Sequence, residues 1–334
     1  MRTVRRLEYA ELWPTLTKGD KSMQAQRLPI CNICQTADTR VMALLESEID
    51  GQEYNAVKCN HCGLVFAFPI PELSFNTLQS VYGDNYTEGQ REMSTSEQAL
   101  RVLRDATNRQ MDIVEKYAPQ GAALNVGAMS SAIKVLEERG WKLRIVEVSS
   151  YAAESARRLW GFDVTVSRIE DFECPPATFD FIKLGHVIEH LADPRLAMQR
   201  LATILKSGGV ILIDTDNAHG LKTQIEVTIR RLFGERLSTS LVKKLTKKNL
   251  RKRYGRLTPP EHLYNFSAKS LTKLLEDTDF EIVKVFKPAW GDPTWFPLTD
   301  QSSFSIIEKM FIKLDQIGAK FGVGDVIAIL ARKH

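Results

Sequence analysis

The chain has 334 residues, of which 43% are hydrophobic and 26% are charged, and its formal net charge is +4. This composition is typical of a globular protein, the length favours two domains over one, and the charge is too small to indicate a nucleic-acid binder by itself. No run of 18 apolar residues is present, which excludes a transmembrane helix.

The first 26 residues contain basic side chains but no apolar segment of the kind that a signal peptide needs. Acidic residues at Glu8, Glu11 and Asp20 argue against a transit peptide. We therefore expect a flexible N-terminal arm over residues 1–26 and a cytoplasmic location.

Four of the five cysteines form two C-x-x-C pairs, Cys31 with Cys34 and Cys59 with Cys62. An Asp50-Gly51 turn between the pairs predicts a hairpin that brings them together, and four thiolates in two such loops are typical of tetrahedral zinc sites. Disulfides and free thiols are the alternatives, but no secretion signal supports disulfides, and His61 is a competing ligand. We predict a zinc ribbon over residues 27–75 in which Zn²⁺ is structural, because four thiolates leave no open position.

Two prolines near residue 70 end the ribbon, and a helical linker is expected over residues 76–117, with its main helix from residue 94. From residue 118 to 334, strands and helices alternate, which predicts an α/β domain with a largely parallel sheet and helices on both faces. The expected elements are a strand at 122–126, a helix at 131–140, a strand at 142–148, a helix at 151–159, strands at 162–166 and 179–184, a helix from 194, a turn at 206–209, a strand at 210–215, a helix at 304–318 and a strand at 325–332.

Ligands of such sheets bind beyond the carboxyl ends of the strands. The first strand is followed by Gly127, and the second ends at Glu147, twenty residues later. A glycine turn followed at this distance by an acid is typical of a nucleotide-ribose site, because the glycine allows close approach of the backbone and the carboxylate binds ribose hydroxyls. A plain α/β crossover with a surface glutamate remains the alternative.

The segment His186-Val-Ile-Glu189-His190 has the spacing of the inverted zinc-peptidase motif. His186 is expected where a strand gives way to a loop, so the two histidines need not share one face of a helix, as a peptidase requires. We therefore do not favour a zinc peptidase.

The segment "FDFIKLGHVIEHLADPRLAMQRLATILKSGGVILIDTDN" (179–217) resembles the central block of class I S-adenosylmethionine (SAM)-dependent methyltransferases. The resemblance is to the subgroup that includes ubiquinone-biosynthesis and sugar O-methyltransferases, and "PPEHLYNFSAKSLTKLLEDTDFEIVKV" (259–285) resembles its downstream block. It implies a Rossmann-like methyltransferase sheet over residues 118–334, with SAM as cofactor, and some bacterial members also have an N-terminal four-cysteine ribbon.

The resemblance also implies the positions that contact SAM. The loop at Gly127 lies under the methionine part, Glu147 binds the ribose, and the segment before the fourth strand lies beside the adenine. The implied cofactor residues are Asn125, Gly127, Ala128, Glu147, Ile169, Glu170, Leu184 and Gly185.

The glycine loop departs from the family pattern D-[VI]-G-C-G-x-G. Asn125 replaces the acid, and Met129 and Ser131 replace two glycines. Larger side chains in this loop can weaken SAM binding. A second hypothesis is therefore that the chain is a catalytically impaired methyltransferase-like scaffold or binding protein.

For an acceptor hydroxyl, His186 and His262 are the candidate general bases, because both fall in blocks that border the active site of the resembled family. A hydrogen-bonded structural role is the alternative for each. Ubiquinone-type relatives hold a divalent ion near this loop with acids and a histidine. Here His186 replaces one of those acids, which disfavours magnesium.

A basic insertion, expected as a helical lid, spans residues 219–258, and its part 228–256 contains eleven lysines and arginines and one acid, a net charge of +10. This charge suits an anionic small-molecule acceptor or peripheral contact with an anionic membrane, whereas the few aromatic residues argue against nucleic acid. We expect O-methylation of a biosynthetic intermediate, either a sugar or polysaccharide precursor or a lipid-linked acceptor. Monomer and homodimer both stay open.

Overall fold

The computed structural model describes residues 29–47, 49–84, 97–128, 130–221, 223–225, 227–228, 232, 254–289, 291–295 and 306–334. The expected N-terminal arm and most of the basic insertion lie outside these residues and stay predictions. None of the described helices is long and apolar enough to cross a membrane.

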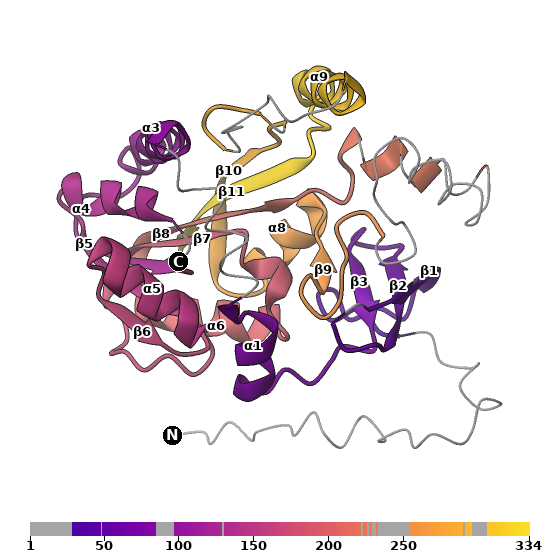
Figure 1. Cartoon of the computed structure of the whole chain (residues 1–334), viewed down its shortest axis with the longest axis horizontal. Helices are drawn as coiled ribbons and strands as arrows, with labels where there is room; N and C mark the ends of the chain where they lie inside the picture. Colours follow the sequence, from indigo (N-terminus) through magenta and orange to yellow (C-terminus); the bar gives the residue numbers. More distant parts are fainter. Residues whose placement is uncertain are drawn as a thin grey trace.

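The two cysteine pairs belong to a small antiparallel sheet with the strand order β1-β2-β3-β9. Its strands are β1 (Thr39–Glu46), β2 (Glu53–Cys59), β3 (Val65–Phe68) and β9 (Tyr264–Asn265). The expected hairpin joins β1 to β2, and Gly51 has a φ of +67°, which glycine adopts without strain. The fourth strand comes from a segment about 200 residues further along the chain, so the ribbon is completed by the C-terminal part of the molecule (Figure 1).

The central sheet has seven strands in the order β10-β11-β8-β7-β4-β5-β6. They are β4 (Ala122–Val126), β5 (Lys142–Glu147), β6 (Val164–Val166), β7 (Phe179–Gly185), β8 (Leu205–Asp216), β10 (Phe280–Phe286) and β11 (Val326–Lys333). The strands from β8 to β6 are parallel, and β11 runs antiparallel to both β8 and β10. The expected α/β sheet is confirmed.

Helices cover both faces of this sheet. The described helices are α1 (Phe75–Val81), α3 (Glu97–Val114), α4 (Val135–Glu138), α5 (Ser150–Trp160), α6 (Pro194–Ile204), α8 (Ala268–Glu276) and α9 (Ile306–Lys320). Side chains of β8 alternate between two cores, since Val210 and Leu212 pack with α3 and α4 while Ile211 and Ile213 pack with α6 and α8. The second of these cores continues into the ribbon sheet without interruption.

Local sequence explains where the helices begin and end. Ser149 accepts a hydrogen bond from the α5 backbone, and Gly161 ends that helix in a left-handed conformation. Asp193 caps α6 just before Pro194, and Ser267 forms a capping box with Ser270 at α8.

The expected turn at 206–209 is part of β8 instead. Phe179 pairs with Leu205 and Phe181 pairs with Val210, so the intervening residues form an irregularity within the strand. Gly208 has a φ of +76°, and the turn-forming glycine is therefore accommodated as a bulge.

Candidate active site at the carboxyl ends of the parallel strands

The loop after β4 brings its backbone close to a neighbouring loop. Gly127 has a φ of +96°, and a Cβ there would lie 3.6 Å from Val187 Cγ2. The Asn125 side-chain amide donates to the Gly127 carbonyl oxygen at 2.7 Å, so the amide that replaces the expected acid holds the loop backbone. Met129 and the side chain of Ser131 lie outside the described part of the chain, and the effect of these two replacements stays a prediction.

Glu147 is almost fully buried at the end of β5. One carboxylate oxygen accepts a hydrogen bond from the Ala128 backbone N–H and the other from the Ser149 N–H, both at 2.8 Å. Burial raises the pKa of Glu147, against the effect of the two donors, which favour the charged form. Each carboxylate oxygen has a second acceptor site, so the group can also accept hydrogen bonds from two hydroxyls.

Helix α1 and the residue after it close the same end of the sheet. The Ser149 hydroxyl donates to the Tyr82 carbonyl oxygen at 2.6 Å, and the Ser150 backbone N–H donates to Gln79 Oε1 at 2.8 Å. Gln79 in turn donates to the carbonyl oxygen of Val148. The helical linker therefore forms one side of the region around Glu147.

The predicted adenine-side residues lie in the loop after β6. Ser167 N donates to the Glu147 carbonyl oxygen at 3.0 Å, so this loop starts beside the ribose-binding candidate. The side chain of Ile169 is packed in the core and is 3% exposed. Glu170 forms an ion pair with Arg168, in which Oε2 lies 3.6 Å from Nε. Burial raises the pKa of Glu170.

The predicted residues at the end of β7 offer mainly backbone to this region. The side chain of Leu184 is fully buried, and a Cβ at Gly185 would lie 3.5 Å from both carboxylate oxygens of Asp214 on β8. His186 has a φ of +50°, in the left-handed region, and its N–H donates to the Asp214 carbonyl oxygen at 2.9 Å.

The His186 side chain forms an ion pair. Its Nδ1 lies 3.2 Å from Glu189 Oε1 and its Nε2 lies 3.6 Å from Asp214 Oδ1. Burial lowers the pKa of His186, but the hydrogen bond and charge of Glu189, with Asp214 and Asp216, raise it to about 9. Burial raises the pKa of Glu189, and His186 lowers it to about 2. His186 is therefore a cation at neutral pH.

The second predicted histidine, His262, is stacked against His190, with ring centroids 4.4 Å apart. His190 Nδ1 lies 2.9 Å from the Glu261 carbonyl oxygen and 3.0 Å from the Tyr82 hydroxyl. Because a carbonyl only accepts, Nδ1 of His190 carries a proton. Nδ1 of His262 lies 3.1 Å from the Thr258 hydroxyl.

Burial disfavours the charged form of both stacked rings. Burial lowers the pKa of His262 to about 3 and also lowers that of His190. Because Nδ1 makes the hydrogen bonds of each ring, Nε2 is the nitrogen left to meet a ligand.

Two sets of these residues are close enough together to share a divalent ion. Glu189, His190 and His262 each offer a ligand atom within 4.8 Å of the others, and so do His186, Glu189 and Asp216. Magnesium prefers about six oxygen ligands, whereas each set offers only three side-chain ligands, two of them imidazoles in the first set and one in the second. Magnesium does not fit these residues, and no step of the proposed reaction passes through it.

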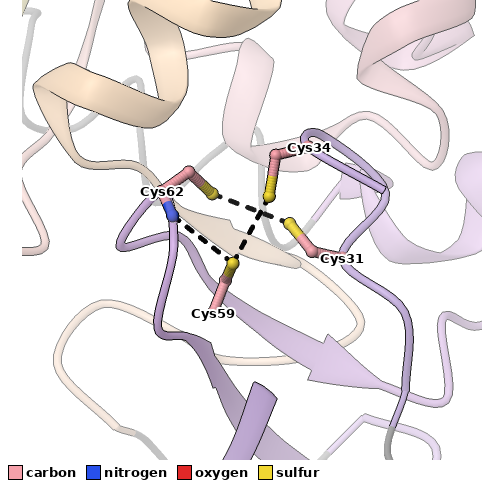
Figure 2. Close-up of side chains that lie close together, drawn as sticks. All are labelled: Cys31, Cys34, Cys59 and Cys62. Atoms are coloured by element: carbon pink, nitrogen blue, oxygen red, sulfur yellow. Dashed lines mark hydrogen bonds between the residues drawn. The ribbon is translucent and has the colours of Figure 1, made fainter. Parts of the chain in front are cut away.

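The four ribbon cysteines converge, as Figure 2 shows. The Cys31 and Cys62 sulfurs are 3.7 Å apart and those of Cys34 and Cys59 are 3.4 Å apart. A disulfide requires about 2.05 Å, whereas four sulfurs at 2.3 Å from a tetrahedral zinc lie about 3.8 Å from one another. His61 is exposed and does not belong to the cluster. The spacing therefore suits a four-thiolate zinc ion.

The ribbon contacts the segment that contains His262. The Ser267 hydroxyl donates to the Cys62 carbonyl oxygen at 2.6 Å, and the Asn32 amide donates to the Tyr264 hydroxyl at 2.6 Å. That hydroxyl donates to the Ala192 carbonyl oxygen at 3.0 Å. Both cysteine loops are thereby linked to the residues around the histidine pair.

Backbone hydrogen bonds extend this link. Ala67 N on the β3 strand donates to the Leu263 carbonyl oxygen, and Leu263 N donates to the Glu189 carbonyl oxygen, both at 2.9 Å. Leu263 directly follows His262, so hydrogen bonds from the ribbon and from Glu189 both hold the backbone next to His262.

Sequence reasoning did not include Tyr82, His190 or Glu189 among the candidate site residues. Glu189 and His190 belong to a short 3₁₀ helix, Ile188–His190. Tyr82 lies in the predicted linker, where no motif marks it, and only tertiary structure brings it to the histidines.

Comparison with known proteins agrees with this architecture. Residues 121–285 match the family model described as a methyltransferase domain. No curated protein sequence matches the chain. The match supports methyl transfer, whereas the ubiquinone and sugar O-methyltransferase subgroup stays a prediction.

Solved structures also align with the chain. A SAM-dependent methyltransferase from Thermotoga maritima, described as a possible histamine N-methyltransferase, is 19% identical, with 73% of this chain and 98% of that chain covered and a TM-score of 0.44. One from Archaeoglobus fulgidus is 16% identical over 75% and 100% of the two chains, with a TM-score of 0.48. Geranyl diphosphate C-methyltransferase from Streptomyces coelicolor is 14% identical over 68% and 79%, with a TM-score of 0.44.

Proposed function

We propose that this chain is a SAM-dependent methyltransferase with a structural zinc ion in its N-terminal ribbon. The observation on which this rests is the buried Glu147 carboxylate, which backbone N–H groups of Ala128 and Ser149 hold beside Gly127. Two donors fix the carboxylate at the carboxyl end of β5, where nucleosides bind in such sheets. The methyltransferase-domain match over residues 121–285 supports the same function.

Bound SAM supplies a methyl group on a sulfonium, which is already activated for in-line displacement. The protein therefore has mainly to align the acceptor with that methyl group and exclude water. Glu147 would hold the ribose, and Gly127 would let the methionine part approach the backbone. The carboxyl end of β7 and the loop at His186 would border the methyl group.

We assign the proton-accepting role to His262. Burial lowers its pKa and favours the neutral ring, and in the tautomer whose Nδ1–H donates to the Thr258 hydroxyl, Nε2 accepts the proton of an acceptor hydroxyl as the oxygen–methyl bond forms. His186 is protonated and paired with Glu189, so it is a poor base. Its role would be to position the loop that holds Glu189 and His190.

The acceptor that we propose is a small anionic molecule such as a sugar or polysaccharide precursor, methylated on oxygen. The basic insertion supports an anionic acceptor, because it has a net charge of +10 next to the segment with His262. The described end of the insertion lies at the carboxyl end of β8, because Arg256 Nε is 3.3 Å from Asp216 Oδ1.

Calorimetric titration of the full chain with SAM and with S-adenosylhomocysteine tests the proposal. We expect micromolar dissociation constants for both, as is usual for an enzyme and its substrate. Absence of binding at millimolar concentration would instead favour the scaffold hypothesis, in which the altered loop at 125–131 no longer accepts the nucleoside.

A further inference from the structure

Helix α9 lies at the outer rim of the molecule, beyond β11 (Figure 1). Three large apolar side chains on and just after it are exposed, Met310 by 51%, Ile317 by 53% and Phe321 by 80%. Their spacing of seven and then four residues places them on one side of a helix. We call this set the α9 face.

The charges beside the α9 face have one sign. Lys309, Lys313 and Lys320 are exposed, and Asp315 is buried on the inner side of the helix. Among the α9 residues whose side chains the structure describes, every exposed charge is therefore a lysine. On a helical wheel the three lysines fall together along one flank of the apolar stripe.

A basic concavity of about 680 Å³ continues this surface at the C-terminal end of α9. Its lining includes Ala319 and Gly322, next to the α9 face, and Lys269, Lys273 and Lys287 from α8 and the end of β10. Lysines thus border the apolar side chains from two elements, and Glu276 is the acid that lines the concavity with them.

The basic insertion starts beside the same helix. A Cβ at Gly318 would lie 3.1 Å from the side chain of Leu221, and Leu221 N donates to the Val323 carbonyl oxygen at 2.9 Å. Leu221 is near the start of the segment 219–258, whose later part has a net charge of +10. The start of the insertion therefore packs against the C-terminal end of α9.

We propose that the α9 face docks on the surface of an anionic phospholipid bilayer. Met310, Ile317 and Phe321 would enter the boundary between headgroups and acyl chains, while the flanking lysines contact lipid phosphates. An apolar stripe with lysines along its edge is the pattern of a helix that lies in this boundary. The charge favours this occupant over a second copy of the chain, because two such faces would bring like charges together.

Co-sedimentation of the full chain with vesicles tests this proposal. Neutral phosphatidylcholine vesicles are compared with vesicles that contain about one third phosphatidylglycerol, at low and high salt. We expect binding to the anionic vesicles that weakens with salt and little binding to neutral ones.

Two variants locate the contact. M310S/I317S/F321S should lower the partition constant at least about tenfold, and K309E/K313E/K320E should lower it about 100-fold. The matched control is V41S/L44S, which removes two exposed apolar side chains from β1 in the ribbon and should bind as the wild type does. Because all of these side chains are exposed, thermal unfolding should be the same in the four proteins.

Three results would overturn the proposal. The first is no binding of the wild type to anionic vesicles. The second is unchanged vesicle binding by M310S/I317S/F321S. The third is a solution dimer, measured by light scattering, that this variant converts to a monomer, since a second copy would then cover the face. None of these measurements depends on methyl transfer.

Discussion

The Asn32 side-chain amide donates a hydrogen bond to the Tyr264 hydroxyl at 2.6 Å, although 232 residues separate them in the chain. Asn32 lies between the first two ribbon cysteines, and Tyr264 lies two residues after His262. The same hydroxyl donates to the Ala192 carbonyl oxygen. One phenol on β9 therefore links the first cysteine loop to the segment before α6.

The substitution Tyr264→Phe should lower the free energy of unfolding by about 1–3 kcal/mol, because it removes two partly buried hydrogen bonds worth about 0.5–1.5 kcal/mol each. It should also lower kcat by displacing His262. Urea unfolding and steady-state assays measure the two effects. Tyr54→Phe is the control, since its hydroxyl bonds only within the ribbon, to Asp50, and it should leave kcat unchanged.

The substitution Glu147→Gln should weaken binding of S-adenosylhomocysteine by about tenfold to 100-fold. The amide keeps the size of the side chain but loses the charge and one acceptor oxygen, and hydrogen bonds to charged groups contribute about 1.5–3 kcal/mol. Calorimetry measures the change. Glu154→Gln on the exposed side of α5 is the matched control, and an equal loss in both variants would contradict the assignment.

Replacing His262 by Asn should lower kcat by about 10²–10⁴ through loss of the proton acceptor. Binding of S-adenosylhomocysteine should be unchanged, because Glu147 and the glycine loop bind the nucleoside. A variant that retains full kcat would return His262 to a structural role. Pre-steady-state mixing separates chemistry from product release and decides which step changed.

Metal analysis should find one zinc per chain, and Cys59→Ser should remove it. The site with three thiolates binds zinc more weakly, and the ribbon depends on the metal for stability, so the melting temperature should fall. A second equivalent that disappears in the His262→Asn variant would show that the histidine group binds a transition ion. Cobalt substitution separates the two sites, because only the thiolate site gives strong sulfur-to-metal absorption.

The His186–Glu189 pair predicts how stability depends on pH. The folded pKa of His186, about 9, exceeds the ordinary 6.5, so its contribution is complete below pH 6.5 and is lost as pH rises through 9. The folded pKa of Glu189, about 2, is below 4.5, so its contribution is complete above pH 4.5 and is lost as pH falls through 2. Asp214 and Asp216 also face His186 and favour its cation.

Wild type and His186→Asn are therefore compared by thermal unfolding between pH 4.5, the ordinary pKa of Glu189, and pH 9, the folded pKa of His186. Asparagine tolerates the left-handed backbone at this position. The difference in melting temperature should be largest near pH 5–6 and should shrink towards pH 9. A difference that is constant over this range would exclude a stabilising ion pair.

The sequence predicted those features that depend on short-range pattern. The C-x-x-C spacing and the Asp50-Gly51 turn predicted the cysteine cluster, and hydrophobic rhythm predicted β4, β5 and β7 within one or two residues. Gly127 and Glu147 were expected to lie together because parallel strands end at the same edge of a sheet, and the Ala128–Glu147 hydrogen bond confirms their proximity.

The remaining features depend on contacts between distant segments. Strand β9 is only two residues long, which is too short for an alternating hydrophobic pattern that would predict its pairing with β3. The charge state of His186 depends on Asp214 and Glu189, which approach it only in the folded chain. For the same reason no local pattern could associate Tyr82 with His190.

The pairing of β3 with β9 means that the ribbon sheet is built from both the N-terminal and the C-terminal parts of the chain. A chain that began after the ribbon would expose the hydrogen-bonding edge of β9 and the apolar residues beneath it, which invites aggregation. If recombination replaced either the ribbon or the rest of the chain with that of a distant relative, β3 and β9 would no longer match each other. The ribbon and the rest of the chain are therefore expected to be inherited together. Either part alone would need a different sequence at the strand edge that the β3–β9 pairing now covers.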